Sequence, residues 1–257
     1  MDDYKRQTAE SNLARSNGYK KTASKVKKDG HKAEEEYALF FGGKVIKGTG
    51  KTDVICPKYG NTTVKAPNGG KVQMLLQTTD KVKSRWGDNH PMYLASLAQR
   101  NLYEDRHFNS GSRSSNLHNE AKEKVSLLTE WLSNKENLKE VLTYALLNDG
   151  EIDNIVDMYR TNFKCAYITK GSDFIQSIID LDPIPKQTDS GLRISISVLT
   201  GKFDKKGNER RRVAFYFEVR SNPGHCKSFL YKMEGGVIFP IIRGKTSCNK
   251  IDNPIFK

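Results

Sequence analysis

The sequence predicts a mixed α/β fold, because helical and strand patterns both occur in it. Apolar residues recur at helical spacing after His31 and in residues 119–132, whereas residues 211–219 alternate between apolar and other side chains in the manner of a strand. A chain of 257 residues is long enough to bury a sizeable core. We therefore expect a small mixed β-sheet flanked by helices, with a helical middle region and a C-terminal β-hairpin.

The N-terminal segment, residues 1–28, predicts a basic arm or helix. It carries eight basic and three acidic side chains and few large apolar groups. From residue 29 onward we expect a single domain. Its first element is a helix with four apolar residues on one stripe, Ala33, Tyr37, Phe40 and Phe41. Gly42-Gly43 ends this helix.

Three short extended runs follow and predict strands: KVIKG, TDVICP and NTTVKAP. The last two are joined by a turn at residues 58–61, so they form a hairpin. KVQMLLQTTDKV begins another element, and together these segments give a core at about residues 29–90.

The middle region, about residues 92–160, reads as helical. Residues 92–104 and 119–132 predict helices, and Ser133 with Glu136 forms a capping box for the next helix, which ends at residues 148–150. The segment EIDNIVDMY then predicts a further helix.

The C-terminal region, about residues 163–257, reads mainly as strands. It begins with FKCAYIT and a short helix after Ser172, and continues with LRISISVLT and RRVAFYFEV around a turn at residues 205–208. The alternation in the last strand predicts one buried face that includes Phe215 and Phe217.

The charge distribution points to a polyanionic partner. Lys and Arg number 43 against 30 Asp and Glu, a formal net charge of +13. The surplus is segregated: residues 202–212 carry six basic and two acidic side chains, whereas residues 119–160 carry nine acidic and five basic ones. Nucleic acid is the expected partner, and a solvated basic surface is the alternative.

The same sequence argues against several other classes of protein. The four cysteines stand singly, without the spacing of a zinc site or a disulfide framework. No stretch approaches the ~20 apolar residues of a membrane span, and the start lacks the layout of a secretion signal. We therefore expect a cytoplasmic protein without a membrane partner.

The predicted hairpin carries a candidate catalytic set. Metal-dependent hydrolysis of phosphodiesters needs a carboxylate to hold the cation and a lysine near the attacking water. Asp53 precedes one strand, and period-2 geometry places Thr63 and Lys65 on one face of the next strand, with Val64 turned into the core. Asp53 and Lys65 can therefore converge, although a plain surface hairpin would share this pattern.

These segments resemble the PD-(D/E)xK type II restriction endonucleases, and among them the compact enzymes that cut four-base palindromes such as GCGC and CCGG. KKDGHKAEEEYALFF is similar to the family's opening helix, KTDVICPKYGNTTVKAPNGGKVQ to its core hairpin, and LRISISVLTGKFDKKGNERRRVAFYFEV to the C-terminal hairpin of the GCGC-cutting enzyme. The resemblance covers 66 residues in three blocks. The motif's proline is replaced by Thr52, and the expected glutamate before Lys65 by Thr63, a weaker metal ligand.

The resemblance implies a restriction-endonuclease-like core, Mg²⁺ as cofactor and double-stranded DNA as substrate. It implies that Asp53, Glu34 and the Val64 carbonyl bind the ion, that Lys65 positions the attacking water, and that Gln73 contacts DNA. A palindromic target favours a homodimer, although the enzymes that this chain resembles also act as monomers. The natural setting would be the bacterial cytoplasm, in restriction–modification.

The expected function is therefore cleavage of double-stranded DNA at a short specific sequence. The alternatives are a non-specific nuclease of the same fold and a basic DNA-binding protein with a degenerate nuclease core. Arg113 and the basic residues of the C-terminal hairpin are the expected DNA contacts, the latter being Lys202, Lys205, Lys206, Arg210, Arg211 and Arg212. Their strands should form a ribbon narrow enough for the ~12 Å major groove.

Overall fold

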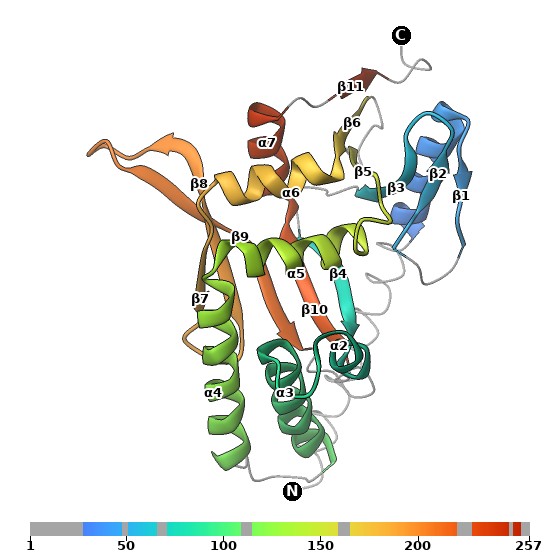
Figure 1. Ribbon diagram of the computed structural model, residues 1–257. Helices are drawn as coiled ribbons and strands as arrows, with labels where there is room; N and C mark the ends of the chain where they lie inside the picture. The colour runs from blue at the N-terminus through green and yellow to red at the C-terminus, as the bar shows by residue number, and fades with distance from the viewer. Residues whose placement is uncertain are drawn as a thin grey trace, which may run out of the picture.

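The computed structural model describes residues 28–47, 51–65, 71–108, 115–158, 165–219, 228–246 and 249–252. These residues form a mixed α/β fold with two β-sheets (Figure 1). The predicted fold class is therefore confirmed at this level. The predicted arm, apart from residue 28, and Arg113 lie outside the described residues.

The first sheet, called here the mixed sheet, has six strands in the order β1-β2-β3-β5-β6-β11. Strands β3 and β5 run parallel, and the other neighbouring pairs are antiparallel. The bounds are β1 (Lys44–Val45), β2 (Val54–Cys56), β3 (Gly60–Lys65), β5 (Asn154–Met158), β6 (Cys165–Lys170) and β11 (Asn249–Asp252). The hairpin β2–β3 thus confirms the predicted one, but the strands beside it come from distant parts of the chain.

A helix over residues 28–41 covers one face of the mixed sheet. Its buried Ala33 and Tyr37 pack in one cluster with Val54, Val64 and Val156 of the strands. The helix ends as predicted, because Gly42 adopts a φ of +61°, which favours a residue without a side chain.

The second sheet is antiparallel, with five strands in the order β4-β10-β9-β8-β7. The bounds are β4 (Lys71–Thr78), β7 (Ile184–Gln187), β8 (Ile194–Phe203), β9 (Glu209–Val219) and β10 (Ser228–Glu234). Strands β8 and β9 form the predicted C-terminal hairpin and continue beyond their neighbours as a two-stranded ribbon (Figure 1).

Helices pack around and between these sheets. Their bounds are α2 (Thr79–Trp86), α3 (Pro91–Phe108), α4 (Ser115–Leu132), α5 (Lys135–Leu147), α6 (Gly171–Asp180) and α7 (Gly235–Lys245). One core cluster contains Ile155 of the mixed sheet and Phe215 and Phe217 of the antiparallel sheet. Phe174 of α6 and Phe239 of α7 belong to the same cluster and are in ring contact. The two sheets therefore share a hydrophobic core.

Residues 154–158 form a strand, so the helix predicted for EIDNIVDMY is wrong. Strand β5 lies between β3 and β6, and Ile155, Val156, Asp157 and Met158 are all buried. A strand covered on both faces has a continuous run of apolar residues, and the periodicity of such a run does not distinguish a strand from a buried helix. The helical region therefore ends at α5, and the mixed sheet reaches well past residue 90.

Two smaller predictions are also corrected. The N-cap of α5 is Asn134, whose side chain accepts the Glu136 N–H, whereas the Ser133 hydroxyl donates to the Thr129 carbonyl in the preceding helix. Strand β9 is covered on both faces at its inner end, because Ala214 and Glu218 are buried along with Phe215 and Phe217.

Within the described residues, no helix has the length and apolar character needed to cross a membrane.

Candidate active site

Asp53 lies where strands β2 and β3 part. Val54, the first residue of β2, is paired with Thr62, and the Asp53 N–H still donates to the Thr62 carbonyl at 3.0 Å. One step further, the Asp53 side chain replaces the backbone as the partner of β3: its Oδ2 accepts the Val64 N–H at 2.7 Å. The end of a β-ladder thus fixes the carboxylate between the two strands.

Three donors converge on this single oxygen. Besides the Val64 N–H, Asp53 Oδ2 accepts the Thr63 hydroxyl at 2.8 Å and the Lys65 ammonium at 3.2 Å. The side chains of Lys65 and Asp53 are 17% and 19% exposed, so the ion pair is largely withdrawn from water. The expected convergence of Asp53 and Lys65 is therefore present.

Thr63 has a different part from the one its sequence position suggests. It is 1% exposed, and its hydroxyl is engaged by Asp53. Thr63 thus orients the Asp53 carboxylate through this hydrogen bond. Val64 faces the core with its side chain, as expected. The N–H and C=O of one strand residue point to the same side, so the Val64 carbonyl lies on the side where Asp53 binds its N–H.

Glu34 lies close enough to feel the charges of this site. Burial raises the pKa of its carboxyl, the hydrogen bond with His31 lowers it, and the negative charge of Asp53 raises it further, while Lys65 lowers it. The carboxylate contacts the ring of His31, with 3.1 Å between Oε2 and Nδ1. Glu34 is therefore held beside the site by its own helix, without a hydrogen bond to Asp53 or Lys65.

The oxygen atoms gathered here suit Mg²⁺. Among the described residues no hydrogen bond reaches Asp53 Oδ1, which leaves this atom available as a ligand, with the Glu34 carboxylate and the Val64 carbonyl nearby. The same residues contain no group of three or more His, Cys, Asp or Glu side chains that could hold a metal. Mg²⁺ prefers oxygen ligands and commonly uses one or two carboxylates plus water, so the present atoms fit it.

Lys51 anchors the segment that leads to Asp53. Its ammonium donates to the Tyr144 carbonyl of α5 and lies 4.2 Å from the centre of the Tyr144 ring. Burial lowers the pKa of Lys51 to about 8. Sequence reasoning did not find this residue, because its partner lies 93 positions further along the chain.

A second buried pair, also missed from the sequence, lies beside Lys65. Asp157 of β5 is the register partner of Lys65 and is 3% exposed. Its Oδ2 accepts the Arg243 Nε of α7 at 2.8 Å, and the Arg243 guanidinium stacks over Tyr167. Burial raises the pKa of Asp157 to about 6, against the opposing effect of Arg243. A charged residue inside an apolar run was the available signal.

The expected DNA contacts are not all in one place. Gln73 is on β4, where it pairs in register with Lys232 of β10, so it belongs to the antiparallel sheet and not to the hairpin of Asp53 and Lys65. The basic residues at 202–212 lie on the β8–β9 ribbon and its turn. Lys205 and Lys206 are exposed in that turn, where Gly207 has a φ of +82°.

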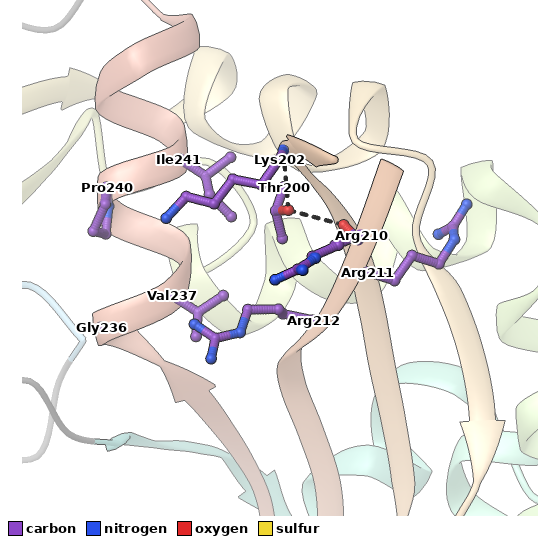
Figure 2. A pocket seen from close by; sticks show the side chains of 9 residues that line it. All are labelled: Thr200, Lys202, Arg210, Arg211, Arg212, Gly236, Val237, Pro240 and Ile241. Carbon is purple, nitrogen blue, oxygen red and sulfur yellow. Dashed lines mark hydrogen bonds between the residues drawn. The ribbon is translucent and has the colours of Figure 1, made fainter. Parts of the chain in front are cut away.

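A pocket of about 580 Å³ lies between the ribbon and α7 (Figure 2). Its lining residues are Thr200, Lys202, Arg210, Arg211, Arg212, Gly236, Val237, Pro240 and Ile241. Lys202, Arg210 and Arg212 extend towards α7, whereas Arg211 extends to the opposite side of β9 (Figure 2). Arg211 binds the backbone and the carboxylate of Asp182 there. Arg210 and Arg212 thus lie on one face of β9, and Arg211 lies on the other (Figure 2).

No protein-family model matches this chain, and no curated protein does either.

Proposed function

We propose that this protein is a metal-dependent endonuclease that hydrolyses phosphodiester bonds in double-stranded DNA at a short specific sequence. The observation that carries the proposal is the convergence of Thr63, Val64 and Lys65 on Asp53, at the end of the β2–β3 hairpin that lies away from its turn. A lysine largely withdrawn from water, beside a fixed carboxylate with one open oxygen, is an arrangement that suits cation-assisted attack by water.

Each residue has a distinct part in this chemistry. Asp53 Oδ1, Glu34 and the Val64 carbonyl would hold the ion. A bound Mg²⁺ lowers the pKa of water and offsets negative charge on the phosphate. Lys65 lies where its ammonium can orient the attacking water, and Asp53 holds that ammonium in place. Thr63 keeps the Asp53 carboxylate in the orientation that leaves Oδ1 open.

The proposed partner is supported by charge. The formal net charge of +13 attracts a polyanion, and the exposed cations of the ribbon offer contacts for its phosphates. We further propose that the mixed sheet, with its opening helix and its β2–β3 hairpin, is a restriction-endonuclease-like core. Homodimer formation on a palindromic site belongs to the same proposal.

A DNA-binding protein with a degenerate nuclease core is the second candidate, and one observation favours it. The position at which the motif has a glutamate holds Thr63, whose hydroxyl is already bound to Asp53. The ion would then be bound by the carboxylates of Asp53 and Glu34 only, without the third carboxylate that a glutamate in place of Thr63 would supply.

Incubation of the protein with plasmid DNA separates these functions. Discrete fragments with Mg²⁺ and none with EDTA would support a sequence-specific endonuclease, and sequencing of the fragment ends would then give the recognised site. A smear would indicate a non-specific nuclease. DNA binding without cleavage under any Mg²⁺ concentration would favour the degenerate protein and reject the proposed activity.

A further inference from the structure

We propose that the pocket between the β8–β9 ribbon and α7 binds phosphate groups of a nucleic acid backbone, without regard to base sequence. The identification of DNA as their source rests on the proposed function, whereas the preference for phosphate rests on the pocket itself.

The first support is a group of cations without counter-charges. Lys202, Arg210 and Arg212 point into the pocket (Figure 2), and within the described part of the chain no carboxylate forms an ion pair with any of them. None of the nine lining residues is acidic. Three neighbouring cations repel one another, and an anion that binds several of them relieves this repulsion. Arginine also offers the planar fork that matches phosphate oxygens.

The ribbon backbone directs these side chains to one side. Arg210 and Arg212 lie two residues apart on β9 and therefore share one of its faces. The register of β8 shifts between Leu199 and Phe203, and Lys202 extends to the same side from this irregular part of the strand (Figure 2). The Thr200 hydroxyl donates to the Arg210 carbonyl at 2.9 Å and so ties the strands together within the pocket. The backbone that carries these side chains is therefore held by the sheet, while the charged ends of the side chains form no ion pair with the described carboxylates.

Arg211 provides a contrast within the same strand. Its guanidinium binds the Asp182 carbonyl and carboxylate, and Lys135 lies 3.1 Å from the other oxygen of that carboxylate. Lys135 and Arg211 together hold the pKa of Asp182 below its usual value. The charge of Arg211 is thus balanced inside the protein, whereas the charges of its two neighbours are not.

The wall opposite the cations is apolar. Val237, Pro240 and Ile241 of α7 form it, and the first turn of α7 adds the positive end of a helix dipole. A volume of about 580 Å³ exceeds the need of a single anion and falls in the range of small-molecule sites. A sugar–phosphate segment matches both sides, because its phosphates can face the arginines while its deoxyribose carbons face the apolar side chains.

Helix α7 also places the pocket relative to Asp53 and Lys65. Ile241 lines the pocket, and Arg243, two residues on, binds Asp157 on the strand next to β3. A strand of DNA that lies in the pocket would therefore follow α7 towards Lys65. This relation distinguishes a backbone-binding pocket from an isolated basic surface.

The test measures DNA binding in EDTA, so that it does not depend on cleavage. Fluorescent duplexes of two unrelated sequences are titrated with wild-type protein and with the variants Arg212→Ala, Arg210→Ala/Arg212→Ala and Arg211→Ala over a range of salt concentrations. We expect the double variant to bind both duplexes about 100-fold more weakly near 0.1 M salt, and the salt slope to fall by about 1.8, which is ~0.9 for each lost contact. Arg212→Ala should lose about half of this free energy, which is about 10-fold in affinity, and about 0.9 in salt slope. Arg211→Ala removes the same single positive charge and should leave both the affinity and the salt slope close to wild type.

Competition identifies the source of the phosphates. Inorganic phosphate and a deoxynucleoside monophosphate are added to the wild-type complex, and their own binding is followed by thermal shift. If either competitor displaces DNA only at millimolar concentrations, the result supports a polymeric backbone as the ligand. If both competitors raise the melting temperature of the wild type but not of the double variant, the result supports the preference for phosphate. Equal DNA affinity of the double variant and Arg211→Ala, with both folded by melting temperature, would overturn the proposal, as would wild-type protein that binds neither DNA nor phosphate. Loss of cleavage with retained pocket-dependent binding would instead reject only the endonuclease activity.

Discussion

Lys65 and Asp157 lie side by side in the register of the parallel strands β3 and β5, yet they are neutralised by different partners. Lys65 binds Asp53, and Asp157 binds Arg243. Because Arg243 occupies the buried carboxylate of Asp157, the Lys65 ammonium stays directed at Asp53. The site is therefore built from two adjacent ion pairs. Each leaves one carboxylate oxygen without a hydrogen bond from the described residues, and in the second pair this oxygen, Asp157 Oδ1, is buried.

We predict that Lys65→Ala and Asp53→Ala abolish cleavage and leave DNA affinity within about 1–2 kcal/mol of wild type. The lysine variant should lose ~10²–10⁴-fold in rate, the range for a side chain that assists proton transfer or orients water. Asp53→Ala removes a ligand and a negative charge, so its affinity for DNA without metal should be equal or higher. Lys58→Ala, which removes an exposed lysine from the turn of the same hairpin, is the matched control. Cleavage at the wild-type rate in either site variant would refute the assignment of the site.

Thr63→Val should raise the Mg²⁺ concentration needed for half-maximal cleavage. The change keeps the shape of the side chain but removes the hydroxyl that binds Asp53 Oδ2. Loss of such an orienting hydrogen bond typically costs 10–100-fold in metal affinity or activity. Thr63→Ser retains the hydroxyl and should restore the Mg²⁺ dependence. An unchanged Mg²⁺ dependence in Thr63→Val, measured on folded protein, would show that Thr63 has no part in positioning Asp53.

The local features of the site could be read from the sequence because they depend on short-range geometry. Thr63 and Lys65 are two residues apart on one strand, and a short turn at residues 57–59 brings that strand back to Asp53. Helix ends with clear signals were also predictable, as at Gly42 and Asn148, where positive φ angles end helices. The C-terminal hairpin was marked by its alternation and by the turn at Gly207.

The remaining features depend on contacts that no local pattern encodes. Strand β5 was mistaken for a helix because it is covered on both faces, and its pairing with β3 joins segments about 90 residues apart. The strand that contains Gln73 could join either sheet by its composition, and only the pairing with β10 places it in the antiparallel one. The same holds for Arg243, whose partner Asp157 is 86 positions away.

The stability of the fold should depend on the ionisation of Asp157. Burial raises its pKa to about 6 from an ordinary value of 3.8, so the folded protein keeps a proton that the unfolded chain releases in this range. The free energy of unfolding should therefore fall, by at most ~3 kcal/mol from this residue, as pH rises from about 4 to about 6. Chemical denaturation of wild type and Asp157→Asn at several pH values measures this as a difference, which removes the contribution of other groups. A wild-type protein that gains stability over Asp157→Asn as pH rises would show that Arg243 lowers the pKa of Asp157 below its ordinary value instead.

The turn at the tip of the ribbon, which carries Lys205 and Lys206, leads to a prediction separate from the one for the pocket at the other end of the ribbon. Lys205 and Lys206 are exposed in a turn held by Asp204, whose carboxylate accepts the N–H groups of Lys206 and Asn208 at 2.8 and 3.0 Å. Because the backbone of the turn is fixed, replacing both lysines with alanine should remove charge without altering the ribbon. If the tip enters a groove of DNA, the double variant should weaken binding to all sequences and lower the salt slope by about 0.9 for each lost phosphate contact. Loss confined to one cognate duplex, of about 1–3 kcal/mol, would instead indicate that a tip residue reads a base. Unchanged affinity and salt slope would show that the tip is solvated, and DNA contact by the ribbon would then be limited to Lys202, Arg210 and Arg212 at its base.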